Sequence, residues 1–380
     1  MSTPIPFNRP QVTDRGREYA LAAMASGHHS GDGPFTRRCH ELLRRDIGVN
    51  KVLLTTSCTS ALEMCALLLD IAPGDEVILP SFTFVSTANA FVLRGAKPVF
   101  ADVRPDTLNL DERLVSSLVT ERTRAILPVH YAGIACEMDP LVTIAGERGI
   151  AIVEDNAHGL FGRYRGKLLG TFGPLATQSF HETKNFSCGE GGALLINDPQ
   201  FAERAEILRE KGTDRSRFFR GEVDKYGWVD LGSSYLPSDV LAALLLAQLE
   251  QWKEIQDRRG SLWNRYHDEL RGWARAHGVV QPTVPAHVES AHHLYYMLVP
   301  SLADRTRLIA HLKSAGVHAV FHYQPLHLSR MGLARGGRPG LCPVTEDVSD
   351  RLIRLPFFNG MTDEEQDRVI EAVLNFQEWC

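Results

Sequence analysis

The chain has 380 residues, 44% of them hydrophobic and 23% charged, which is long enough for two domains or for one large core with an appendage. Its formal charge of −5 and the lack of any long run of Lys or Arg argue against a nucleic-acid-binding surface but leave room for a local phosphate pocket. The sequence has no apolar run close to the ~20 residues of a membrane helix and no signal-peptide pattern at its N-terminus.

The seven cysteines are scattered, odd in number and never spaced as C-x-x-C. A disulfide scaffold or a structural zinc site would show pairing or tight spacing. We therefore expect free thiols in a reducing cytoplasm, no bound metal and no membrane contact.

Short apolar runs alternate with helical periods from residue 51 onward, which predicts repeated βα units. A helix is expected at 57–70, with Ser60 and Glu63 as a capping box at its start, followed by a turn at 73–75. Strands separated by helices predict a mostly parallel sheet that presents ligand-binding groups at its carboxyl edge. In chain order, the further elements expected are a strand at 76–79, a helix at 83–94, strands at 98–103 and 124–129, a helix at 141–148, and strands at 150–154, 178–180 and 192–196.

The C-terminal third begins with a strongly helical stretch at 239–273, which is expected to bridge to a smaller domain. In that domain we expect strands at 294–299 and 319–322 and a helix at 306–315. The predicted domains are residues 1–250 and 251–380.

One lysine stands in a loop of polar and small residues between two predicted strands. Residues 179–185 read Ser-Phe-His-Glu-Thr-Lys-Asn and precede a glycine-rich turn at 189–192. Lys184 in such a loop can act as a Schiff-base nucleophile if its surroundings lower its pKa. Because most lysines are solvated surface charges, the prediction depends on the residues that accompany it.

Asp155 follows the apolar run 150–154, at the edge where a parallel sheet presents ligand-binding groups. A cofactor with a protonated pyridine ring needs a carboxylate there, although many Asp residues at strand ends are only turn formers. Residues 55–60 carry hydroxyl groups and stand at the start of a predicted helix, where backbone N–H groups are free. This arrangement can bind a phosphate, but the hydroxyls can equally serve only to cap the helix. Ser179 can add a hydroxyl to that phosphate, and Phe84 can stack on an aromatic ring or simply pack in the core.

Four separated motifs occur in order: residues 56–59, residues 80–84, residues 154–158, and the run from Ser179 through Lys184 to 189–192. Together they resemble the DegT-type sugar aminotransferases, which are fold-type I enzymes that use pyridoxal 5'-phosphate (PLP). The resemblance extends from Ile5 to the C-terminus. It implies an α/β fold with a large domain, whose mostly parallel mixed sheet is sandwiched by helices, and a smaller α/β C-terminal domain.

The resemblance also implies roles for individual residues. Lys184 holds PLP as a Schiff base, Asp155 pairs with the ring nitrogen, and His158 lies near the ring hydroxyl, so these three are the expected catalytic residues. Phe84 covers the ring. The phosphate is held by Ser57, Cys58, Thr59 and Ser179 and, from the neighbouring subunit of a homodimer, by Ser234, where many relatives carry Asn.

Seven segments are closer still to the dTDP-4-amino-4,6-dideoxygalactose transaminases of this family: residues 30–35, 179–185, 211–216, 218–221, 224–226, 232–235 and 320–323. This implies transfer of an amino group from L-glutamate to the C4 ketone of dTDP-4-keto-6-deoxy-D-glucose, for glycan or natural-product sugar synthesis. Cations between the core and the bridging helix would bind the diphosphate, although a solvated basic loop would read the same way. The substrate residues expected are Phe7, Lys211, Arg215, Arg220, Lys225, His322, Tyr323 and His327.

Three alternatives remain open at this point. The first is amination at C3 or a different nucleotide carrier. The second is a related dehydratase, which is disfavoured because such relatives replace the lysine with His. The third is a non-catalytic regulatory protein with the same fold, which the joint presence of Lys184, Asp155 and the phosphate hydroxyls argues against.

Overall fold

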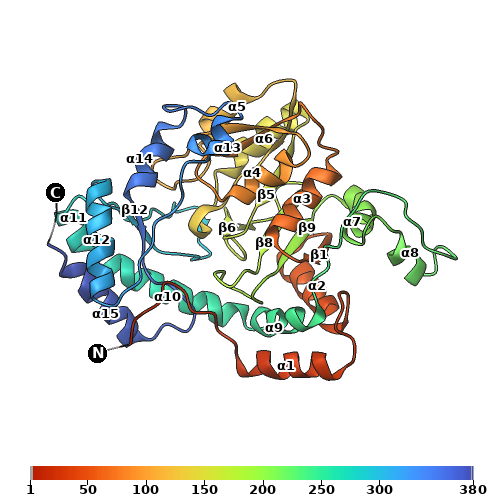
Figure 1. Cartoon of the computed structure of the whole chain (residues 1–380), viewed down its shortest axis with the longest axis horizontal. Helices are drawn as coiled ribbons and strands as arrows, with labels where there is room; N and C mark the ends of the chain where they lie inside the picture. Colours follow the sequence, from red (N-terminus) through yellow and green to blue (C-terminus); the bar gives the residue numbers. More distant parts are fainter. Residues whose placement is uncertain (1–2, 378, 380) are drawn as a thin grey trace.

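A seven-stranded sheet forms the centre of the protein in the computed structural model, which describes residues 3–377 and 379 (Figure 1). The strand order is β1-β9-β8-β5-β4-β2-β3, and β9 runs antiparallel to both of its neighbours while all the other neighbouring pairs are parallel. The predicted mostly parallel mixed sheet is therefore confirmed. The strands are β1 (Lys51–Thr55), β2 (Glu76–Pro80), β3 (Lys97–Ala101), β4 (Thr123–Ile126), β5 (Ala151–Asp155), β8 (Leu175–Ser179) and β9 (Gly192–Ile196).

Helices cover both faces of this sheet, because alternate side chains of its strands are apolar on both sides. Leu53 of β1 joins a core with the helices on one face, whereas Leu54 joins a core with those on the other. The first face carries α3 (Cys58–Leu68), α4 (Val85–Val92) and α7 (Ala202–Arg209), and the second carries α2 (Pro34–Ile47) and α9 (Asp239–Leu249), with α1 (Asp14–Ala25) packed on α9.

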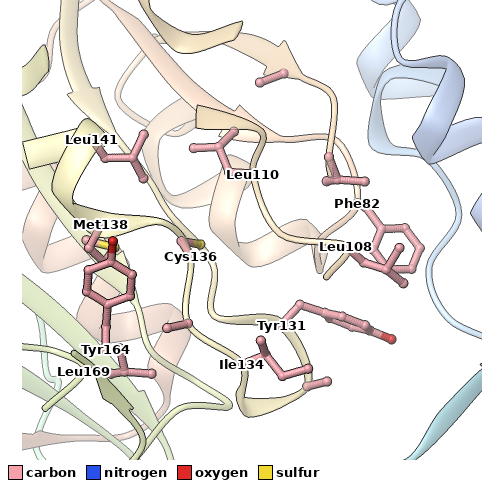
Figure 2. Close-up of a cluster of buried hydrophobic side chains, with 14 of the residues drawn as sticks. Phe82, Leu108, Leu110, Tyr131, Ile134, Cys136, Met138, Leu141, Tyr164 and Leu169 are labelled. Atoms are coloured by element: carbon pink, nitrogen blue, oxygen red, sulfur yellow. The ribbon is translucent and has the colours of Figure 1, made fainter. Parts of the chain in front are cut away.

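A further core lies under α5 (Glu112–Leu118) and α6 (Met138–Arg148) and reaches toward the carboxyl edge of the sheet. Figure 2 shows part of it, with Leu141 of α6 and Leu110 at one end and the rings of Phe82 and Tyr131 at the other. The centroids of these two rings are 5.1 Å apart in an edge-on arrangement. This core therefore places two buried aromatic rings beyond the ends of β2 and β4.

The C-terminal part has a separate core around the paired strands β11 (Tyr296–Leu298) and β12 (Leu352–Arg354). Ile5 joins this core and lies in a bridge with Val317, so the N-terminal segment packs with the C-terminal part. We keep the division at residue 250 as a proposal, since α9 ends and α10 begins there. The helices of this part are α10 (Trp252–Glu269), α11 (Arg271–Ala276), α12 (Leu302–Ser314), α13 (Arg330–Leu333), α14 (Pro343–Arg351) and α15 (Asp363–Leu374).

The remaining elements are short. The strands β6 (Arg163–Tyr164), β7 (Lys167–Leu168) and β10 (Val288–Glu289) form a small sheet. Helix α8 (Arg215–Phe219) stands with its following loop at the edge of the molecule, at the right of Figure 1. In the part of the chain that the structure describes, no helix is both long and apolar enough to cross a membrane.

Two local predictions are wrong. The helix expected from residue 57 is capped by Ser57, whose Oγ accepts the N–H of Ser60 at 3.0 Å, so Ser60 lies inside the helix and forms no capping box with Glu63. The segment 319–322 is not a strand. Among the described residues Val320 makes only a single bridge, to Arg354 at the end of a β12 that is three residues long.

Candidate active site

The carboxyl ends of β1, β2, β5 and β8 and the start of β9 surround one cavity of about 760 Å³. Parallel strands bring their carboxyl ends to the same edge of a sheet, which is why residues far apart in the sequence meet here. Segments from the C-terminal part close the other side. The predicted residues that line the cavity are Phe7, Ser57, Cys58, Thr59, Phe84, Asp155, His158, Ser179, Lys184, His322 and Tyr323.

Lys184 lies on the loop between β8 and β9, and hydrogen bonds hold this loop in place. The N–H of Phe180 donates to the carbonyl of Gly191 at 2.8 Å, and the N–H of Lys184 donates to the carbonyl of His181 at 2.9 Å. The next residue, Asn185, donates from Nδ2 to the carbonyl of Ala291 at 2.7 Å. The backbone of Lys184 is thus held between the central sheet and the C-terminal part.

Burial lowers the pKa of Lys184 to about 8, although the nearby Asp155 acts in the opposite direction. At pH 7 roughly one-tenth of such amines are neutral, against well under one in a thousand for a solvated lysine. Only the neutral amine can attack a carbonyl carbon. The surroundings of Lys184 therefore lower its pKa, which is the condition that a Schiff-base nucleophile has to meet.

Asp155 ends β5 and is almost completely buried, with 5% of its surface exposed. Its Oδ2 accepts the hydroxyl of Thr87 at 2.7 Å, and its Oδ1 accepts the N–H of Ala157 at 3.2 Å. The hydroxyl of Thr83 lies 3.0 Å from that of Thr87 and fixes its position. The carboxylate is oriented by these contacts and faces the same cavity as Lys184.

His158 has one defined tautomer. Its Nδ1 accepts the N–H of Ala132 at 3.3 Å, so the ring proton is on Nε2. Its ring stacks on that of His293 at 4.0 Å between centroids. Burial, with the charge of Lys184 adding to it, lowers the pKa of His158 well below 6.5, so the ring stays neutral and Nε2–H is a donor.

The start of α3 forms a phosphate cradle. Ser57 caps the N–H of Ser60, while the N–H groups of Cys58 and Thr59 belong to the first turn and have no partner within the helix. Such free amides at the positive end of a helix bind phosphate groups. Gly192 approaches this turn so closely that a Cβ would lie 2.4 Å from the nitrogen of Cys58. The cradle, the lysine and the carboxylate together fit PLP, with its phosphate, aldehyde and ring nitrogen.

We expect Gly192→Ala to weaken PLP binding by roughly tenfold or more, because the new methyl group would push the first turn of α3 away from the phosphate. Equilibrium dialysis of PLP against the cofactor-free protein measures this. Gly146→Ala in α6 is the matched control, because a Cβ there meets nothing within 4 Å. Equal PLP affinity in the two variants would contradict the cradle.

Aromatic side chains form the cavity wall opposite the sheet edge. Phe84 is the N-cap residue of α4 and is 58% exposed, and its ring centroid lies 6.4 Å from that of Tyr323. Tyr323 stacks on His322 at 3.6 Å, and Nδ1 of His322 lies 3.1 Å from the hydroxyl of Tyr131. Phe84 is free to cover a ring bound between it and the strand ends.

Four other predicted residues line a different cavity. Lys211, Arg215, Arg220 and Ser234 face a second hollow of about 840 Å³, next to α8. Lys211 and Arg215 both pair with Glu210, at 3.2 and 3.1 Å, and Arg220 pairs with Glu206 at 2.8 Å. Lys225 is exposed and lines neither hollow in the described part of the chain. Within one chain these cations do not reach Lys184.

His327 does not face the cavity, contrary to expectation. Its ring is completely buried, with Nδ1 2.6 Å from the hydroxyl of Ser81 and Nε2 3.0 Å from Glu346. Both ring nitrogens are therefore used inside the fold, and His327 is a structural residue that ties the segment after β2 to the C-terminal part.

Several cavity residues were missed from the sequence. Thr87 and His293 orient Asp155 and His158, and Arg354 lines the wall beside Phe7. For Thr87 a signal existed, because it lies one helical turn after Thr83 at the start of a predicted helix. No motif marks His293 or Arg354, since their positions follow from how the C-terminal part folds over the sheet.

The comparison with known proteins agrees with this geometry. A profile of the DegT/DnrJ/EryC1/StrS aminotransferase family matches residues 10–374. An uncharacterized protein from Methanocaldococcus jannaschii is 35% identical over 348 residues, which cover 90% of this chain and 89% of that protein.

Solved structures give the same result. The aminotransferase TlmJ from Streptoalloteichus hindustanus has a TM-score of 0.88 at 31% identity over 97% of both chains. DesV from S. venezuelae has a TM-score of 0.87 at 30% identity over 100% of both chains. Spr1654 from Streptococcus pneumoniae, described as a sugar aminotransferase and solved in its PLP form, has a TM-score of 0.90 at 29% identity over 97% of both chains. The chain belongs to the DegT/DnrJ/EryC1/StrS aminotransferase family and is a PLP-dependent sugar aminotransferase of fold-type I architecture.

Proposed function

We propose that this enzyme transfers the amino group of L-glutamate to C4 of dTDP-4-keto-6-deoxy-D-glucose and so produces a dTDP-4-amino-4,6-dideoxyhexose. The observation that carries the chemistry is the meeting of three groups in one cavity: the partly neutral amine of Lys184, the buried carboxylate of Asp155 and the free amides of α3. The choice of sugar and nucleotide is supported by the segments that resemble the C4 transaminases, above all residues 179–185 and 211–216.

The cofactor would be held by residues from four strand ends. The amides of Cys58 and Thr59, with the hydroxyls of Ser57 and Ser179, would bind its phosphate, and Phe84 would cover its ring. The carboxylate of Asp155 would pair with the ring nitrogen and the Nε2–H of His158 would donate to the ring oxygen. When bound, PLP supplies an electron sink for the carbon that bears the amino group.

Lys184 moves the proton in both half-reactions. As its neutral amine it would take the proton from Cα of glutamate, and as the ammonium it would deliver that proton to the cofactor carbon that receives the amino group, acting as general base and general acid in turn. In the second half-reaction the same amine delivers the proton to C4 of the sugar. A pKa of about 8 suits both roles near neutral pH, because neither form of the amine is scarce.

A homodimer fits the placement of the remaining predicted residues. Phe219 lines the second hollow and is 70% exposed, and Phe218, in ring contact with both Phe219 and Tyr226, completes a group of exposed aromatic side chains. Large apolar side chains exposed together mark interaction surfaces. We propose that a second copy of the chain covers this region, so that Ser234 and the cations Lys211, Arg215, Arg220 and Lys225 complete the other subunit's active site. The hydroxyl of Ser234 is shorter than the Asn of many relatives, so a bridging water is expected at that contact.

The product decides between the proposal and its nearest rival, amination at C3. The enzyme is incubated with PLP, L-glutamate and dTDP-4-keto-6-deoxy-D-glucose, and the product is analysed by proton NMR. We expect an amino group on C4, and the H3–H4 coupling then distinguishes an equatorial amine, with a large value, from an axial one, with a small value. An amino group on C3, or conversion of glutamate to 2-oxoglutarate without any amino sugar from this substrate, would contradict the sugar assignment and leave the aminotransferase assignment in place.

A further inference from the structure

His293 is a buried histidine in the active-site wall that uses one of its two ring nitrogens. It is 6% exposed and lines the same cavity as Lys184. Its Nδ1 lies 2.9 Å from Oδ1 of Asn185. The other ring nitrogen, Nε2, has no hydrogen-bond partner among the described residues, so its partner has to come from the cavity.

The proton of the His293 ring is on Nδ1. The amide of Asn185 donates from Nδ2 to the carbonyl of Ala291 at 2.7 Å, and a carbonyl can only accept, so Oδ1 is the amide atom that faces His293. Because an amide oxygen also only accepts, His293 has to donate from Nδ1. Burial lowers the pKa of His293 well below 6.5, which keeps the ring neutral at pH 7. Nε2 therefore carries a lone pair and no proton, and it is a hydrogen-bond acceptor.

Histidines with a structural role in this protein use both ring nitrogens. In the completely buried His130, Nδ1 accepts a backbone N–H and Nε2 lies 3.1 Å from Glu154. His327 also uses both of its nitrogens inside the fold. The ring of His293 is fixed by Asn185, yet its second nitrogen is unpaired. An unpaired buried acceptor costs free energy, and a ligand that brings a donor to it removes that cost.

We propose that His293 is a specificity-determining residue that accepts a hydrogen bond from the C3 hydroxyl of the keto sugar. This inference rests on the proposed function, because it assigns one contact to the sugar named there. Glutamate offers no suitable donor, since its two carboxylates only accept and its amine is the group that is transferred. The C3 hydroxyl stands on the carbon next to the C4 ketone, so it enters the cavity together with the reacting carbon.

The stacked rings of His158 and His293 then offer one nitrogen of each kind to the cavity. His158 presents Nε2–H, which suits the oxygen on the cofactor ring, and His293 presents a lone pair, which suits a hydroxyl. The ring centroids are 4.0 Å apart, so the two partners would bind side by side. The ammonium of Lys184 is a competing donor, but it is present whichever sugar is bound, and a comparison of sugars therefore separates the two.

The test compares dTDP-4-keto-6-deoxy-D-glucose with its 3-deoxy analogue, which lacks the proposed donor, on the PLP-loaded enzyme. For the parent enzyme kcat/KM should be roughly 10- to 100-fold lower with the analogue, because Nε2 stays unpaired. In His293→Phe, which keeps a ring to stack on His158 but has no acceptor, the two sugars should differ by less than about threefold. His293→Gln, whose amide oxygen can reach toward the position of Nε2, should restore part of the discrimination. Single-turnover mixing with L-glutamate alone should change less than about twofold in His293→Phe, since no sugar takes part.

His267→Phe is the matched control, because His267 also stacks on an aromatic ring, that of Trp263 at 4.9 Å, yet lies outside the cavity. It should discriminate between the two sugars as the parent enzyme does. Discrimination that persists in His293→Phe would overturn the proposal, and a slower glutamate step in that variant would then limit His293 to supporting His158. If the parent enzyme aminates both sugars equally well, the contact alone is wrong. If it forms no amino sugar from either compound, the sugar assignment under the proposed function is wrong as well.

Discussion

Replacing Lys184 with Ala should lower turnover by at least about 10⁴-fold, because the variant loses both the amine that attaches the cofactor and the group that carries the proton. The protein should remain folded. The loop keeps its backbone hydrogen bonds to the sheet, and Asn185 keeps its contact with the carbonyl of Ala291. Steady-state formation of 2-oxoglutarate from L-glutamate, with the sugar present, measures the effect.

The stability of the cofactor-free Lys184→Ala variant provides a second test, because the direction of the change in melting temperature can be predicted. The pKa of Lys184 is about 8 in the fold and 10.5 for a solvated lysine, so the folded state binds fewer protons between these values. Lys184 therefore destabilises the cofactor-free fold below pH 8, and this penalty disappears as the pH rises through 10.5. We expect Lys184→Ala to melt higher than the parent protein at pH 7 and to lose that advantage above pH 10.5.

Lys313→Ala is the control, since Lys313 is exposed on α12. It should match the parent protein in turnover and in melting at both pH values. Appreciable turnover in Lys184→Ala, more than about one-hundredth of the parent rate, would overturn the assignment of Lys184.

The positions of Asp155 and Lys184 could be predicted because they follow from the geometry of the sheet. Asp155 is the last residue of a buried strand, and Lys184 follows the next strand of the sheet. Because parallel strands end at one edge, knowing the order of elements is enough to place such residues together. The start of α3 was predicted from the hydroxyl-bearing residues that lead into a helical pattern, even though its cap was misassigned to Ser60.

Residues contributed by the C-terminal part could not be placed in this way. His322 and His327 are only five positions apart in the sequence, yet one lines the cavity and the other is buried against Ser81. The direction of each ring depends on partners from distant segments, which no local pattern encodes. Arg354 was missed because no sequence motif marks it, and only the fold reveals that it has no acidic partner among the described residues.

The cations around α8 illustrate a different limit of prediction from sequence. Lys211, Arg215 and Arg220 were expected at the substrate, and a single chain pairs them with Glu210 and Glu206 around a separate hollow. A sequence indicates which residue types a ligand needs but not which subunit presents them. Their role therefore depends on the proposed homodimer, whereas the roles of Lys184 and Asp155 do not.

Asp155→Asn should lower turnover by roughly 10²- to 10⁴-fold while the enzyme still binds PLP, because the neutral amide cannot keep the ring nitrogen protonated. The fold should accept the change. The amide oxygen can still receive the N–H of Ala157, and the amide nitrogen can face Thr87, whose hydroxyl turns to donate to Thr83 at 3.0 Å. The substitution should therefore slow the reaction without destabilising the fold. Turnover is measured by 2-oxoglutarate formation, and PLP content by absorbance after gel filtration.

The same substitution at a surface carboxylate is the control for the effect of Asp155→Asn. Asp268 on α10 is exposed and pairs with Arg271, so Asp268→Asn should change neither PLP content nor turnover. If Asp155→Asn instead kept turnover within about tenfold of the parent enzyme, the carboxylate would only position Thr87 and Ala157. If the variant lost PLP altogether, its main role would be to hold the cofactor. Retained cofactor with lost turnover is the outcome that assigns Asp155 to the electronic control of the ring, because only then is binding separated from chemistry.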